Sequence, residues 1–145
     1  MRKLNRIILG VLQALIALTA MAGGFMFVKD PTGAVMGYSV SVLTGSIFPD
    51  FLVPGLFLSI VNGLGSLVGA VLSFTRNRYA GPAAIALGAI LVAWIVIQVI
   101  VIRSIHWLHG IYFVLGLVEF MLGMLVNRRQ TEAAQHLADT SPADG

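Results

Sequence analysis

Glu119 is the residue whose type departs most from its surroundings, because it interrupts the apolar stretch GLVEFMLGML at residues 116–125. A carboxyl group in hydrocarbon needs a partner, a proton or a function, so intramembrane acids are candidates for proton relays and cation sites. The structural alternative is a protonated acid that hydrogen-bonds a neighbouring helix, because burial favours the neutral form of a carboxyl group. The sequence leaves both interpretations open.

Two side-chain amides complete a candidate intramembrane polar site of Glu119, Gln13 and Asn62. Gln13 and Glu119 each lie about seven residues from the basic end of an apolar run, so both are roughly 10 Å deep. Because the first and last runs of a four-span protein are antiparallel, we predict a hydrogen bond between Gln13 and Glu119. Asn62 lies nearer the middle of its run. Amides at such positions are more typical of hydrogen bonds between membrane helices than of ligand sites.

A candidate outer pocket consists of Gln98, Trp94 and His109. Trp94 and Gln98 are spaced to share one face of a helix, and His109 lies at the same end of the next run. His106 and His109 share a face in the same way, which raises the alternative of a metal or haem site. No acid or further histidine accompanies them in this short connection. We therefore expect neither a metal ion nor another cofactor.

The composition places the chain in lipid. Of its 145 residues, 58% are hydrophobic and only 10% are charged, whereas soluble domains are about 25% charged. The basic residues flank apolar runs, so they read as topology signals and not as a nucleic-acid surface. The absence of cysteine excludes disulfides, thiolate metal sites and thiol redox chemistry. No nucleophile motif, phosphate loop or zinc signature is present, so nothing supports catalysis.

Four apolar runs are long enough to span a bilayer, since about 20 helical residues cross about 30 Å of hydrocarbon. We predict an all-α integral membrane four-helix bundle, up-down-up-down, with one long outer connection. Residues 1–126 form the four-span domain, and residues 127–145 form a cytoplasmic tail that is partly disordered. The predicted spans are about 7–28, 51–74, 82–102 and 105–126.

The first run also resembles a signal peptide, because MRKLNR precedes it and Ala20-Met21-Ala22 fits a cleavage site. The run continues to Val28, which favours an uncleaved first span. Of the nine Lys and Arg residues, only Lys29 and Arg103 lie at the opposite end of the spans from the others. This bias predicts a multi-pass membrane protein with both termini cytoplasmic.

Three of the spans carry a stripe of small and polar residues at alternating steps of three and four, which is the spacing of a helix-packing seam. In the third span, Ala86, Ala89 and Ala93 form a face of their own. The stripes are Gly10, Gln13, Ala17, Ala20 and Gly24; Gly55, Ser59, Asn62, Ser66, Gly69 and Ser73; and His109, Tyr112, Gly116, Glu119 and Gly123.

The outer connection, 29–50, is too apolar to be fully solvated, so we expect it to dock over the bundle. We expect the docked segment to line the outer pocket with Gln98, Trp94 and His109.

The stretch GGFMFVKDPTGAVMGYSVSVLTGSIFPDFLVPG, followed by WIVIQVIVI, resembles a family of uncharacterised small bacterial four-span membrane proteins. The resemblance covers about residues 7–126, and it implies a multi-pass protein of the bacterial cytoplasmic (inner) membrane. The architecture is also similar to that of DoxX-like proteins, some of which belong to redox or electron-transfer assemblies. Small multidrug transporters also have four spans and one membrane acid, but their acid lies in the first span, where this chain has Gln13.

Three functions follow from these observations. The leading hypothesis is a structural or accessory subunit of a membrane assembly, because the polar residues suit helix packing. The first alternative is a small transporter or channel that uses Glu119. The second is a lipid- or quinone-binding membrane protein. The expected partner is the lipid bilayer, and no nucleic acid is expected. The sequence leaves open both a homodimer and a larger membrane partner.

The predicted topology is tested by single cysteines introduced at Ser41 and Ser141. We expect a membrane-impermeant maleimide to label Ser41→Cys in intact cells and to label Ser141→Cys only after lysis. The cysteine-free chain is the background for both variants. Labelling of both positions from outside would show that the assigned orientation is wrong.

Overall fold

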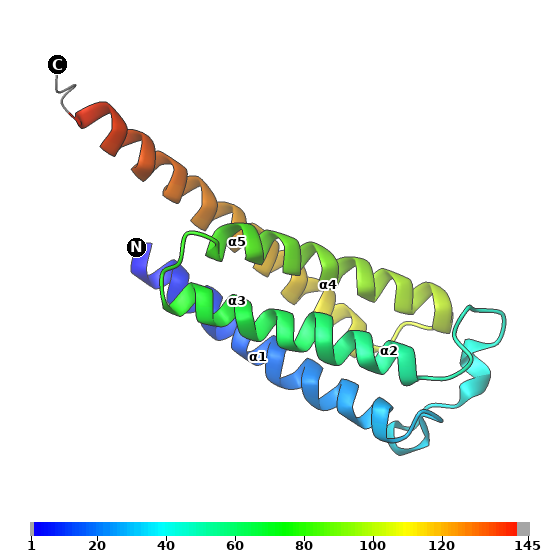
Figure 1. Ribbon diagram of the computed structural model, residues 1–145. Helices are drawn as coiled ribbons and strands as arrows, with labels where there is room; N and C mark the ends of the chain where they lie inside the picture. Colours follow the sequence, from blue (N-terminus) through cyan, green and yellow to red (C-terminus); the bar gives the residue numbers. More distant parts are fainter. Residues whose placement is uncertain (1, 142–145) are drawn as a thin grey trace.

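The computed structural model describes residues 2–141, in which every regular element is a helix (Figure 1). Two short 3-10 turns lie in the outer connection, η1 (Ala34–Met36) and η2 (Val40–Leu43). The other elements are α1 (Arg2–Lys29), α2 (Leu52–Phe57), η3 (Leu58–Leu64), α3 (Gly65–Phe74), α4 (Ala80–Ile102) and α5 (Trp107–Thr140).

These elements build a four-helix bundle of the predicted class. The elements α2, η3 and α3 follow one another without a break and act as one span, Leu52–Phe74. With α1, α4 and α5 they give four helices that are long and apolar enough to cross a membrane. Successive helices run in opposite directions, so the two chain ends lie at one end of the bundle and the connection 29–50 at the other (Figure 1).

The last helix differs from the predicted span at both ends. It begins at Trp107, because His106 is its N-cap: the His106 side chain accepts from the backbone N–H of Leu108 at 3.5 Å. In return, the backbone N–H of His106 donates to His109 Nδ1 at 3.0 Å. It continues to Thr140, so most of the predicted tail is helical and extends beyond the bundle (Figure 1). The prediction of disorder at the chain end concerns mainly residues 142–145, and these lie outside the described residues.

Glycine lets the helix backbones touch. A Cβ added at Gly88 would lie 2.6 Å from the Phe120 nitrogen and 2.7 Å from the Gly116 oxygen. A Cβ at Gly24 would lie 2.6 Å from the Gly55 oxygen. The α4–α5 and α1–α2 contacts therefore have no room for larger side chains. Such close approach is the usual way in which helices pack in lipid, where dispersion contacts replace the hydrophobic driving force.

The predicted stripes in α1, in the second span and in α5 face the interior, with all of their members buried or half-buried. The packing face of α4 is different from the alanine face noted in the sequence. Ala86, Ala89 and Ala93 are exposed, whereas Ala84 and Gly88 are buried against α5. Because α4 is apolar all round, its sequence does not distinguish the lipid face from the packed face.

The outer connection is docked over the bundle, as its apolar content predicts. Leu43 is only 3% exposed and packs with Phe27 of α1 and Phe51, which precedes α2. Its apolar residues nevertheless divide into two sets. Val35 and Ile47 remain exposed, Ile47 at 89%, so the segment covers the bundle and also presents apolar side chains outward.

Asp30 holds the start of this connection in place. Its carboxylate accepts hydrogen bonds from the Thr32 hydroxyl and from the backbone N–H of Val35, the latter at 2.9 Å. The Thr32 hydroxyl has the larger effect, and together these donors lower the pKa of Asp30 below its ordinary value. Hydrogen bonds to the charged form have this effect in general.

The ionised form of Asp30 is therefore expected to stabilise the connection. A group with a lowered folded pKa contributes stability that is complete above its unfolded value, about 3.9, and is lost as pH falls through the folded value. We expect the thermal stability of the wild type, relative to Asp30→Asn, to be constant from pH 7 to 5 and to fall below about pH 4. A wild-type advantage that grows with acidification would contradict this assignment.

Candidate functional site

The inner polar site is a hydrogen-bonded chain across three helices. Gln13 Nε2 donates to Glu119 Oε1 at 3.0 Å, and Ser73 Oγ donates to Gln13 Oε1 at 2.7 Å. All three side chains are completely buried. The structure thus brings Gln13 of α1 and Glu119 of α5 together as their matching depths predict, and it adds Ser73 of α3.

The neighbourhood of Gln13 is built around its amide. A Cβ at Gly69 would lie 2.6 Å from Gln13 Nε2, so the glycine provides the space that this group occupies. Glu119 Oε2 is buried and has no hydrogen-bond partner among the described residues. The chain of hydrogen bonds therefore begins at Ser73 and ends at Glu119.

Asn62 does not belong to this chain. It lies seven positions before Gly69 in the second span, about 10 Å away along the helix axis. Its Nδ2 is buried without a partner within residues 2–141, as is the neighbouring Ser59 Oγ. Both residues lie in η3, a π-helical stretch that the sequence did not predict. Such stretches often occur at functional sites.

An apolar layer separates the inner polar site from the outer end. Ile16, one turn above Gln13 on α1, packs against Leu91 and Ile95 of α4, and these three side chains are almost fully buried. A proton or cation moving from Glu119 to the outer end would have to pass this layer. The geometry of Glu119 therefore suits the fixing of helix register better than a transport path.

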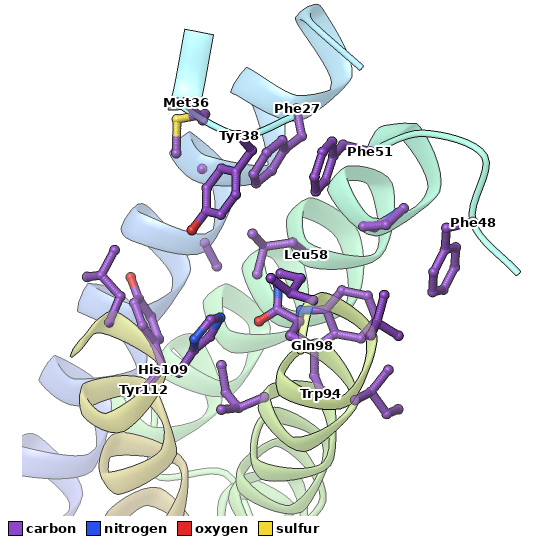
Figure 2. A pocket seen from close by; sticks show the side chains of 18 of the residues that line it. Phe27, Met36, Tyr38, Phe48, Phe51, Leu58, Trp94, Gln98, His109 and Tyr112 are labelled. Atoms are coloured by element: carbon purple, nitrogen blue, oxygen red, sulfur yellow. The ribbon is translucent and has the colours of Figure 1, made fainter. Parts of the chain in front are cut away.

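The outer pocket is a cavity of about 230 Å³ beneath the outer connection. It is lined by all four spans and by the connection, and Figure 2 shows its side chains converging. It contains Gln98, Trp94 and His109, the residues chosen from the sequence. Its other labelled side chains are Phe27, Met36, Tyr38, Phe48, Phe51, Leu58 and Tyr112.

Aromatic rings form much of its wall. Phe27 and Phe51 are stacked with ring centroids 4.9 Å apart, and Tyr38 lies against both. Behind this wall, Phe57 stacks on Trp94 with ring centroids 4.3 Å apart. The sequence predicted that the outer connection, which carries Tyr38 and Phe48, lines this pocket. It did not identify Phe27, Phe51 or Tyr112 as pocket residues, because they come from separate segments.

Three side chains give this apolar pocket specific polar groups. His109 Nδ1 accepts the hydrogen bond from the His106 backbone, so the proton of the neutral ring is on Nε2. The ring can therefore donate from Nε2 to a molecule in the cavity. Trp94 Nε1 is a buried donor with no partner in the described part of the chain. Gln98, one turn further along α4, offers both a donor and an acceptor.

This geometry is unsuited to a metal ion. His109 Nδ1 is already engaged, and the centroids of the His106 and His109 rings are 6.5 Å apart. Among residues 2–141, no three His, Cys, Asp or Glu side chains are grouped to hold a metal. The arrangement can instead hold an apolar molecule through aromatic contacts and a few hydrogen bonds.

Comparison of the chain with protein-family models, with curated proteins and with solved structures finds no match. The function is therefore inferred from the geometry of the two sites.

The inner hydrogen-bond chain predicts a graded response to substitution of Glu119. Glu119→Gln keeps an acceptor for Gln13, so we expect little change in thermal stability in detergent. Glu119→Leu removes the hydrogen bond and should cost roughly 0.5–2 kcal/mol, as for other hydrogen bonds between membrane helices. In a Gln13→Leu background, Glu119→Leu should cost less than in the wild type, because the shared bond is already lost. Fully additive costs would show that the two side chains are not coupled.

Proposed function

We propose that this protein binds a small lipophilic molecule with hydrogen-bond-accepting oxygens, and that a quinone head group is the ligand class that fits best. The observation that supports this proposal is the outer pocket, which has aromatic walls, the His109 Nε2 donor and a buried donor, Trp94 Nε1, without a partner within residues 2–141. Buried donors are normally paired, so an acceptor supplied by a ligand would satisfy Trp94 Nε1.

The size of the pocket narrows the ligand class. Pockets for drug-sized ligands usually have volumes of about 300–1,000 Å³, and this one has about 230 Å³. It therefore suits a head group, with any long tail leaving between helices into lipid. A quinone head combines a flat ring, which stacks on aromatic side chains, with carbonyl oxygens that accept hydrogen bonds. A lipid ester has the same acceptors without the ring.

The proposed location is the bacterial inner membrane with both termini in the cytoplasm. The distribution of Lys and Arg supports this orientation, because basic residues concentrate on the cytoplasmic side. The pocket would then lie near the outer face of the membrane. A ligand dissolved in the bilayer could reach it between the spans without entering water.

The two other hypotheses from the sequence receive less support. A transporter that uses Glu119 needs a polar path, and the layer around Ile16 and Leu91 is apolar. An accessory subunit needs only a surface for its partner, and it requires neither an aromatic pocket nor an unpaired buried donor such as Trp94 Nε1. Ligand binding accounts for these features directly, so we place it first.

Tryptophan fluorescence provides the test. The chain has two tryptophans, so Trp107→Phe leaves Trp94 in the pocket wall as the only one. In detergent, we expect decylubiquinone to quench Trp94 with saturation. His109→Phe should weaken binding roughly 2–10-fold, which corresponds to the loss of one hydrogen bond.

A pair of glycine variants in the Trp107→Phe background controls for non-specific quenching. A Cβ at Gly23 meets only Leu58 Cδ2 at 3.6 Å, so Gly23→Leu is expected to fold and to fill the cavity. Gly110 is at the same end of the bundle and has nothing within 4 Å of an added Cβ, so Gly110→Leu should bind normally. Unsaturable quenching that is equal in both variants would contradict the proposal. If methyl decanoate displaced decylubiquinone and bound the pocket equally well, the pocket would be assigned to lipid carbonyls instead.

A further inference from the structure

A second cavity lies at the opposite end of the bundle, and we propose that it binds the phosphate of an anionic phospholipid. This cavity of about 120 Å³ lies between the start of α1 and the part of α5 that is proposed to lie near the cytosol. It is remote from the outer pocket and shares no lining residue with it. The proposal is therefore independent of the ligand proposed above.

The charge around this cavity is positive and unbalanced. The side chains of Arg2, Arg6 and Arg129 line it, and within residues 2–141 no carboxylate does. The Arg76 guanidinium adds to this field, because it repels that of Arg6. Guanidinium groups bind phosphate oxygens through charge-assisted hydrogen bonds. A bound anion would relieve the mutual repulsion of these arginines.

Two buried polar atoms at this site lack partners within residues 2–141. Arg6 Nη1 is one, and it is a donor suited to a phosphate oxygen. Gln130 Oε1 is the other, although Gln130 Nε2 donates to the Asn77 carbonyl at 3.1 Å. The Gln130 oxygen is an acceptor and would not bind phosphate. It suits a hydroxyl of the lipid head group, as in phosphatidylglycerol.

The position of the cavity favours a lipid over free phosphate. Ile8 and Leu125 lie one turn closer to the middle of the bundle than Asn5 and Arg129, on the same two helices, and both are exposed. These apolar side chains would contact acyl chains while the head group lies in the cavity. Basic pockets between membrane helices at this level are known to bind anionic lipid head groups.

The test compares lipids on the delipidated protein in detergent. We expect phosphatidylglycerol to raise the melting temperature more than phosphatidylcholine, whose head group is zwitterionic. Arg6→Gln and Arg129→Gln should each weaken the response to phosphatidylglycerol roughly fivefold in midpoint concentration, the effect of one arginine near a lipid surface. Arg78→Gln is the matched control, because Arg78 is at the same end but is engaged with Tyr79 and lines neither cavity.

Each alternative result would overturn the proposal. An equal response to the two lipids would exclude recognition of net negative charge. An equal loss in Arg78→Gln would indicate a general charge effect without a site. Inorganic phosphate that reproduced the whole stabilisation without lipid would make free phosphate the ligand. If Arg6→Gln does not fold, Arg129→Gln and native mass spectrometry of the wild type with each lipid still distinguish these outcomes.

Discussion

The hydrogen-bond chain through Gln13 is the interaction on which the arrangement of the bundle depends. A buried amide in hydrocarbon is costly unless its donor and acceptor are both used. Gln13 meets this requirement by joining Ser73 of α3 to Glu119 of α5. Because each partner lies on a different helix, sliding or rotation of any one helix would leave polar groups unpaired. One amide therefore fixes the register of three helices.

Backbone contact between the helices makes this register possible. Gly69 leaves room for the Gln13 amide, and Gly88 brings the backbone of α4 against that of α5. The two features reinforce each other, since hydrogen bonds across helices need short interhelical distances. The apolar layer of Ile16, Leu91 and Ile95 then divides the bundle. On one side lies the hydrogen-bonded polar chain, and on the other lies the aromatic pocket with the buried Trp94 donor, which has no partner within residues 2–141.

The outer connection turns the open end of the bundle into a pocket. Leu43 anchors it against Phe27 and Phe51, while the Asp30 turn sets where it leaves α1. Among the described residues, the opposite end of the bundle has no comparable cover, and its arginines line a second cavity. The two ends thus differ in chemistry: one offers aromatic rings and neutral donors, and the other offers positive charge.

The sequence by itself determined the number of spans, their alternating direction and the faces of the first, second and fourth spans, because apolar length and the spacing of small and polar residues are local properties of the chain. It also indicated the Gln13–Glu119 bond, since depth along a helix follows from residue count, and it identified Gln98, Trp94 and His109 as neighbours. It did not reveal the packed face of α4, whose composition is uniform, or the π-helical stretch at Asn62. Only the tertiary structure decided that Ser73 completes the polar chain, that Phe27 and Phe51 enclose the pocket and that Arg6 and Arg129 share a cavity. These relationships join residues far apart in the chain, and their geometry depends on how closely the helices pack.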